Sequence, residues 1–193
     1  MYNNYYHHYQ WYDPVLAGWN NNHFHYGWSP HYYNWSHANG NRYWNRYQNT
    51  IELRDYGPKP FVVNIEQATK QNNTFRTALW TGNHLQVTLM SINVGDDIGL
   101  ENHPNTDQFI RVEEGQGLVR MGDRKDHLDF EQRVNDNDAI MVPAGTWHNI
   151  INTGNTPLKV YSIYAPPHHP FGTVHETKAS AMASEQSTQE SSR

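Results

Sequence analysis

Short runs of β-favouring residues, each closed by turn residues, fill the middle of this chain of 193 residues. Gly, Asn and Asp cluster between the runs, for example at 95–97, 115–117 and 135–137. Many short strands with regular turn signals are typical of an all-β sandwich or barrel. The sequence therefore predicts a small double-sheet jelly roll, with strands at 61–65, 75–80, 85–93, 108–113, 117–121, 128–134, 139–142, 149–152 and 158–164.

A short helix is also predicted, at 65–71, before most of the strands. Side chains of a strand alternate between its two faces, so the run at 85–93 can be divided. One face carries Leu85, Val87, Leu89 and Ser91, and the other carries Gln86, Thr88, Met90 and Ile92. The sequence alone does not decide which face lines the interior.

Four side chains with metal-binding groups lie near the ends of predicted strands: Glu101, His103, Gln108 and His148. Glu101 and His103 are two residues apart, so they point to the same face of an extended chain. A turn at 104–106 would fold this segment back on the run that Gln108 opens, and His148 follows a second, Pro-Ala-Gly turn. Imidazole, carboxylate and amide oxygen are a plausible first shell for a divalent ion. The sequence therefore predicts a metal site at one end of the barrel.

The same residues occupy the positions of two motifs of the cupin superfamily, which the chain resembles over roughly residues 60–170. The usual first motif reads Gly, five residues, His-x-His, three or four residues, Glu, six residues and Gly. Its positions are held here by Gly95, Glu101, His103, Gln108 and Gly115. The usual second motif reads Gly, five residues, Pro-x-Gly, two residues, His, three residues and Asn. Its positions are held here by Asn137, Pro143, Gly145, His148 and Asn152. The resemblance implies a double-stranded β-helix, the cupin form of the jelly roll.

Two ligand positions depart from the usual first motif, because Glu101 replaces a histidine and Gln108 replaces a glutamate. Three histidines and one glutamate carry one negative charge, and the set found here also carries one. The resemblance implies one divalent ion, Fe²⁺, Mn²⁺, Ni²⁺ or Zn²⁺, held by Glu101, His103, Gln108 and His148. The alternative is a metal-free barrel whose inward polar groups hydrogen-bond to one another and to water.

Proteins similar to this one in the superfamily include dioxygenases, decarboxylases and sugar isomerases. The resemblance thus implies a metalloenzyme acting on a small oxygen-rich molecule, with Glu101 as the candidate catalytic group. Asn152 and Tyr161 are candidate substrate-binding residues, although Asn152 could instead tie backbone segments together. Tyr161 and Tyr164 lie on opposite faces of the last predicted strand, so at most one of them lines the pocket. The family also implies a homodimer, and residues 51–65 could cover an exposed sheet edge.

The ends of the chain differ in composition from the predicted domain at 51–172. Residues 1–50 are rich in Tyr, His, Asn and Trp, and Val15 and Leu16 are the only Val, Leu or Ile there. We interpret this low-complexity segment either as an arm that binds assembly partners or as an extension without a specific role. Its composition resembles the arms of bacterial spore-coat proteins. Residues 173–193 are rich in Ser, Glu, Gln and Ala, which predicts a disordered tail.

The segment 165–172 contains prolines at 166, 167 and 170, which exclude a central strand. Its simplest interpretation is an exposed exit from the barrel with solvated histidines. Alternatively, it packs across the barrel and brings His168, His169 or the later His175 to the mouth.

Composition argues against several classes of function. The chain has no cysteine, so disulfides and thiolate metal sites are excluded. The formal net charge of −5 gives no electrostatic support for nucleic-acid binding. No apolar run is long enough for a membrane span, and the amino terminus lacks the pattern of a signal peptide. The predicted location is the cytoplasm or a spore coat.

Two non-catalytic hypotheses remain beside the metalloenzyme. In the first, the barrel is a structural or binding protein of a spore coat or similar assembly, anchored by its aromatic arm. In the second, an empty barrel senses a ligand, which is weakened because the chain shows no DNA-binding domain.

Overall fold

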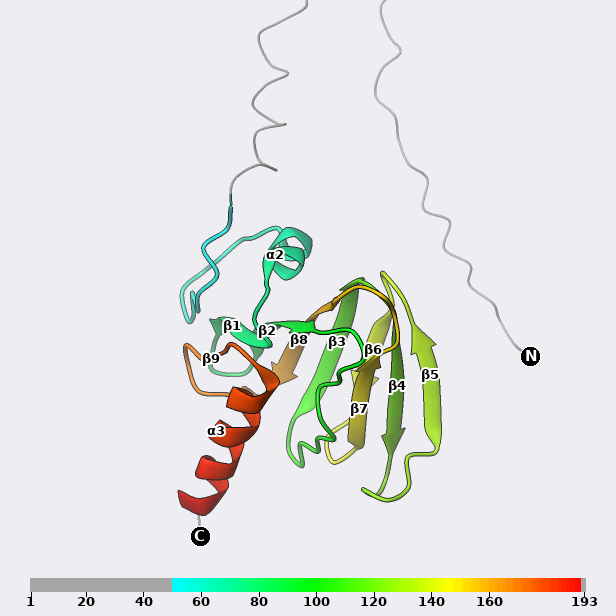
Figure 1. The fold of residues 1–193 in the computed structure, drawn as a ribbon. Coiled ribbons are helices and arrows are strands. Elements are labelled where there is room, and N and C mark those ends of the chain that lie inside the picture. Colours follow the sequence, from blue (N-terminus) through cyan, green and yellow to red (C-terminus); the bar gives the residue numbers. More distant parts are fainter. Residues whose placement is uncertain (1–49, 192–193) are drawn as a thin grey trace, which may run out of the picture. The chain divides into compact units, whose positions relative to one another are not determined.

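The structure is a computed structural model in which residues 50–191 are described, so the predictions for the arm at 1–50 and its partners lie almost wholly outside the described residues. The described strands form two antiparallel sheets (Figure 1). The larger sheet has the order β6-β3-β8-β2-β1-β9, with bounds Ala139–Val142, Asp107–Glu114, Leu158–Ala165, Gln86–Ile92, Arg76–Thr81 and Val174–His175. The smaller sheet has the order β5-β4-β7, with bounds Phe130–Val134, Gly117–Gly122 and Trp147–Asn152. The predicted all-β jelly roll is confirmed.

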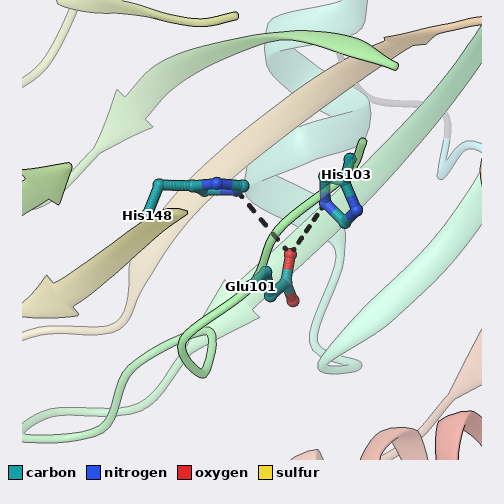
Figure 2. A group of neighbouring side chains, drawn as sticks. All are labelled: Glu101, His103 and His148. Carbon is teal, nitrogen blue, oxygen red and sulfur yellow. Dashed lines mark hydrogen bonds and ion pairs between the residues drawn. The ribbon is translucent and has the colours of Figure 1, made fainter. Parts of the chain in front are cut away.

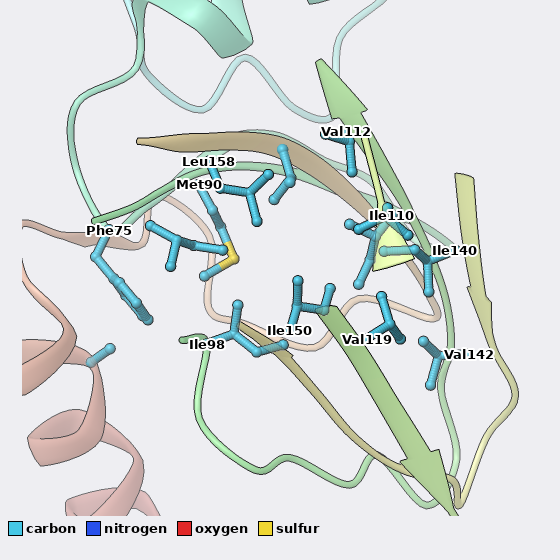
Figure 3. Packing of buried hydrophobic residues seen from close by; sticks show 14 residues of the cluster. Phe75, Met90, Ile98, Ile110, Val112, Val119, Ile140, Val142, Ile150 and Leu158 are labelled. Carbon is cyan, nitrogen blue, oxygen red and sulfur yellow. The ribbon is translucent and has the colours of Figure 1, made fainter. Parts of the chain in front are cut away.

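The main core lies between the two sheets (Figure 3). On β2, Met90 and Ile92 belong to this core, whereas Leu89 belongs to a second cluster. The face of β2 that carries Gln86 and Thr88 therefore also points inward, because alternate residues share a face. The core consists of Phe75, Met90, Ile92, Ile98, Ile110, Val112, Val119, Val134, Ile140, Val142, Ile150, Leu158, Val160 and Ala181.

The inward face of the larger sheet is apolar at one end and polar at the other. On β8, Val160 joins the core, but Ser162 and Tyr164 further along the same face are buried and polar. Gln86 on β2 and Gln108 on β3 flank Tyr164 across the sheet, and both are buried. Polar groups in a buried place need partners, so this end of the barrel is where a ligand would be expected.

The outer face of the larger sheet is covered by residues 51–65 and by helix α2 (Ile65–Gln71). Leu79 of β1 and Leu89 of β2 form the buried centre of this second cluster. Asn64 caps the helix, since its side-chain oxygen accepts a backbone hydrogen bond from the first turn. The predicted helix is confirmed with the same bounds.

The predicted strand at 61–65 is wrong. Phe61, Val63 and Ile65 pack against the second cluster, while Val62 between them is 94% exposed. The alternation therefore arises because this segment lies across the face of the sheet rather than within it. Residues 51–65 cover this face and also bond to the backbone of β1, since the N–H of Tyr56 donates to the carbonyl of Leu79 and that of Thr81 donates to Asp55.

Turns at the motif positions need a left-handed backbone. Gly95, Gly115 and Gly145 have φ angles of 74°, 99° and 79°. Asn137 stands where the second motif usually has glycine, and its φ is 72°. Asparagine tolerates this region better than other side chains, which explains how the motif keeps its turn without glycine.

Replacing Asn137 with alanine is expected to lower the free energy of unfolding by about 1 to 2 kcal/mol relative to Asn137→Gly. Both changes remove the hydrogen bond that the Arg111 side chain donates to Asn137, at 2.9 Å, so their difference isolates the backbone conformation. Urea denaturation of the two variants measures it. Equal stabilities would show that the turn imposes no such cost.

The C-terminal segment has regular structure as far as Ser191, which corrects the predicted disorder for these residues. Strand β9 pairs with β1, and helix α3 (Lys178–Ser191) follows it. Neither α2 nor α3 is long and apolar enough to cross a membrane.

Two anchors hold the start of α3. The ammonium group of Lys178 lies 2.9 Å from a carboxylate oxygen of Asp96 and 2.8 Å from one of Asp97, in the loop that begins the first motif. Ala181 is 2% exposed and belongs to the main core. Composition missed this helix because only a few residues of a polar segment make these contacts.

Candidate metal centre

Glu101, His103 and His148 come together at the polar end of the barrel (Figure 2). One ligand atom from each lies within 4.8 Å of the others. The Nε2 atom of His103 is 3.2 Å from Oε2 of Glu101, and that of His148 is 3.9 Å from the same oxygen. The three side chains are at most 12% exposed, so the cluster is largely shielded from solvent.

Backbone pairing brings the two motifs together. Glu101 and His148 form an antiparallel bridge in which each N–H donates to the other's carbonyl at 2.9 Å. Residues opposite each other in such a bridge carry their side chains on the same face. In addition, the N–H of Gly145 donates to the carbonyl of His103 at 2.9 Å. The turn of the second motif is thus tied to the ligands of the first.

The carboxylate of Glu101 is held at both oxygens. Arg76 on β1 donates from Nη2 to Oε1 at 3.1 Å, and His103 donates from Nε2 to Oε2 at 3.2 Å. Burial alone would raise the pKa of Glu101, but the hydrogen bond from His103 and the charge of Arg76 outweigh it and leave the pKa below its usual value. Glu101 is therefore ionised at neutral pH.

His148 presents an unprotonated nitrogen to Glu101. Its Nδ1 lies 3.0 Å from the backbone carbonyl of Thr146, and a carbonyl can only accept, so Nδ1 carries the proton. Burial lowers the pKa of His148, so the ring stays neutral. Its buried Nε2 has no hydrogen-bond partner. The lone pair of Nε2 therefore faces the Glu101 carboxylate, as in histidine ligands oriented by a second hydrogen bond.

These residues fit a divalent ion. An imidazole nitrogen or a carboxylate oxygen binds such an ion at about 2.1 Å, so two ligand imidazoles have ring centres roughly 5 Å apart. The ring centres of His103 and His148 are 5.3 Å apart. Binding would replace the hydrogen bond between His103 and Glu101, because Nε2 must give up its proton to act as a ligand.

Gln108 lies on β3 beside Tyr164, at the same polar end. It is 3% exposed, and its Nε2 is 3.4 Å from the hydroxyl of Ser162. Its Oε1 is buried without a partner. The amide oxygen could therefore accept a hydrogen bond or bind an ion as a neutral ligand.

Tyr164, and not Tyr161, lies at the polar end of the barrel, near the candidate metal ligands. Its ring centre is 5.6 Å from that of His103. The side chain is fully buried, and burial raises its pKa to about 12. The hydroxyl is therefore a neutral donor or acceptor over the physiological range.

Two predicted substrate-binding residues lie elsewhere, and both predictions are corrected. Tyr161 packs against the second cluster on the outer face, because Tyr164 and Ser162 set the inward register of β8. Asn152 is 1% exposed and donates from Nδ2 to the carbonyls of Ile92 and Thr156 at 2.9 and 2.8 Å. Its role is to tie backbone segments at the apolar end of β7, which was the alternative interpretation.

Sequence reasoning missed Arg76 altogether. Arg76 is 1% exposed although it carries a full charge. Its only sequence signal is a charged residue inside a strand-like run, and such residues usually lie on an exposed face. The segment after β8 also reaches the site: His169 is 9% exposed, and the ring of His168 contacts that of His103. Of the two interpretations of this segment, packing across the barrel is the one observed.

A jelly roll in which two motif segments bring a carboxylate and two imidazoles together is the arrangement of a cupin. The chain belongs to the cupin superfamily, and the family described as a cupin domain matches residues 88–164.

Three proteins are similar to the folded unit of this chain. The uncharacterized protein YrkC of Bacillus subtilis is 75% identical over 133 residues, which are 69% of this chain and 72% of YrkC. The uncharacterized protein L612 of Acanthamoeba polyphaga mimivirus is 41% identical over 115 residues, which are 59% of this chain and 70% of L612. The crystal structure of BH2720 from Bacillus halodurans is 71% identical, with a TM-score of 0.67 over 68% of this chain and 99% of BH2720. Their names assign no reaction, so a function has to be argued from the site.

Buried neutral histidines make the metal-free protein sensitive to acid. Burial lowers the pKa of His148 and of His169. In the unfolded chain these histidines become protonated below about pH 6.5, while in the folded protein they stay neutral. Because the unfolded state then binds more protons, we expect the free energy of unfolding to fall as the pH drops from about 7 to about 5. Urea denaturation across this range measures it, and a constant midpoint would contradict the burial of neutral rings.

Proposed function

We propose that this chain is a mononuclear metal-binding cupin, in which Glu101, His103 and His148 hold one divalent ion for chemistry on a small oxygen-rich molecule. The observation that carries the proposal is the unprotonated nitrogen of His148, which faces a carboxylate oxygen of Glu101 at 3.9 Å in a buried place. Two electron-pair donors so placed repel each other unless a cation lies between them. Their separation is less than twice a coordination distance of about 2.1 Å, so one ion can contact both.

The donor set favours a transition metal. Two imidazoles and one carboxylate resemble the facial triad that leaves positions open on Fe²⁺, and imidazole also suits Ni²⁺ and Zn²⁺ while carboxylate suits Mn²⁺. Gln108 would add a neutral amide oxygen from β3. The ligand set carries one negative charge whether or not Gln108 binds, because Glu101 is charged while Gln108 and the two ligand imidazoles are neutral.

Arg76 orients the carboxylate of Glu101. The hydrogen bond from Arg76 holds Oε1 and so keeps Oε2 turned toward the histidines. Because its pKa is lowered, Glu101 is ionised and suited to bind a cation, and it is not a proton donor. Glu101 is therefore the proposed ligand, and as the carboxylate of the cluster it is also the proposed catalytic group.

The polar end of the barrel would bind the small molecule. Oε1 of Gln108 is buried there without a hydrogen-bond partner, and the buried hydroxyls of Thr88 and Tyr164 lie on the same inward face. An oxygen-rich molecule could satisfy them by hydrogen bonding, which would also orient it next to the ligands. When bound, the ion would supply Lewis acidity toward that molecule, and iron would add dioxygen chemistry. This supports a reaction of the dioxygenase, decarboxylase or isomerase type.

Metal analysis tests the proposal. Full-length protein without a histidine tag is reconstituted in turn with Fe²⁺, Mn²⁺, Ni²⁺ and Zn²⁺, passed through gel filtration and analysed by elemental mass spectrometry. We expect about one tightly bound equivalent of at least one of these ions. Less than about a tenth of an equivalent of every ion would overturn the proposal.

A further inference from the structure

The imidazole of His168 covers His103 on its solvent side. The ring centres of the two histidines are 4.0 Å apart, and the ring of His168 also lies 5.7 Å from that of Tyr164. His168 is itself exposed, whereas His103 is 6% exposed and Tyr164 is fully buried. His168 therefore lies between solvent and the buried cluster.

A single buried side chain holds the backbone of this segment in place. Gln86 donates from Nε2 to the carbonyl of His169 at 2.9 Å, and its Oε1 accepts from the N–H of His169 at 2.9 Å and from that of His168 at 3.4 Å. Gln86 is fully buried at the start of β2. Prolines at 166, 167 and 170 stiffen the chain on both sides of the two histidines. The segment is thus fixed as a unit over the polar end.

His168 is not placed as a further ligand of the same ion. Two imidazoles that share an ion have ring centres roughly 5 Å apart, as His103 and His148 do at 5.3 Å. The 4.0 Å between His168 and His103 is too short for this arrangement and is a packing contact. The ring of His168 therefore occupies space beside a ligand without sharing its ion.

We propose that His168 is the residue that controls access of small molecules to the metal centre, with Gln86 as the positioning residue that holds it there. This inference rests on the proposed function, since it concerns the route to the same ion. A molecule entering from solvent has to displace the ring of His168 from His103 before it reaches the cluster. His168 thereby restricts entry to molecules small enough to pass it.

Variants of His168 test this inference in the full-length protein. His168→Ala removes the ring, and His168→Phe keeps a ring but no nitrogen. His84→Ala, in the exposed connection between β1 and β2, is the matched control that also loses one histidine. Each protein is loaded with Co²⁺, and the release of the ion to excess EDTA is followed by stopped-flow absorption. In parallel, the rate at which diethyl pyrocarbonate modifies His103 in the metal-free proteins is measured by peptide mass spectrometry.

We expect His168→Ala to speed both Co²⁺ release and modification of His103 by roughly five- to tenfold, as for the loss of one ring contact. The equilibrium affinity for Co²⁺ should not change, and His168→Phe and His84→Ala should behave like the wild type. Unchanged rates in His168→Ala would overturn the inference. Weaker Co²⁺ binding in both His168 variants would also overturn it, because His168 would then be a ligand. If the wild type binds no Co²⁺, the proposed function fails, while the modification rates still decide whether His168 covers His103.

Discussion

Replacing Arg76 with methionine is expected to lower the free energy of unfolding of the metal-free protein by about 3 to 5 kcal/mol. Arg76 and Glu101 form a buried ion pair at 3.1 Å, with side chains 1% and 12% exposed. Methionine is long and apolar, so it replaces much of the volume of the arginine side chain but none of its charge. The carboxylate of Glu101 would then lose a buried cationic partner, and an uncompensated buried charge is strongly destabilising.

A double-mutant cycle separates the charge from the packing. The variants are Arg76→Met, Glu101→Gln and the two together, each unfolded in urea without metal. Because glutamine carries no charge, we expect the double variant to lose less stability than the sum of the two single losses. Additive losses, or a loss below about 1 kcal/mol for Arg76→Met, would show that the ion pair does not stabilise Glu101.

Local patterns in the sequence predicted the strands well because turn residues mark where each strand ends. Ala139–Val142 has the bounds that the alternation and its flanking turns predict. The strand predicted at 149–152 begins two residues earlier in the structure, at Trp147, because β4 pairs with it as far as Gly122, which lies opposite Trp147. At 61–65 a strand is predicted where none forms. Alternation indicates that one side of a segment is buried, but it does not indicate that the segment is hydrogen-bonded into a sheet.

Part of the site was predictable for the same reason. Glu101 and His103 share a face by local spacing, and the motif pattern joined them to His148. The contribution of Arg76 depends on how β1, β2 and β8 pair, which no local pattern reports. The choice between Tyr161 and Tyr164 failed similarly, because alternation defines two faces of β8 without saying which one points inward. Only the packing of the two sheets decides this.

Replacing His148 with glutamine is expected to weaken the binding of the divalent ion by more than about 100-fold. His148 offers a buried nitrogen whose lone pair is fixed toward Glu101 by the hydrogen bond of Nδ1 to Thr146. Substitutions that merely disturb such an orienting partner already cost about 10- to 100-fold in metal affinity, so losing the nitrogen itself should cost more. Isothermal titration of the full-length protein with Zn²⁺ and Ni²⁺ measures the change, and thermal unfolding checks that the variant is folded.

The histidines of residues 1–50 make a matched control essential, because they too can bind metal weakly. His84→Ala also lacks one histidine, but its position in the β1–β2 connection is exposed. Weak binding by scattered imidazoles is therefore the same in both variants, and only His148→Gln removes a group from the buried cluster. Equal affinities in the two variants would place the ion outside Glu101, His103 and His148. If only His148→Gln loses affinity, the two motifs bind the metal as their geometry predicts.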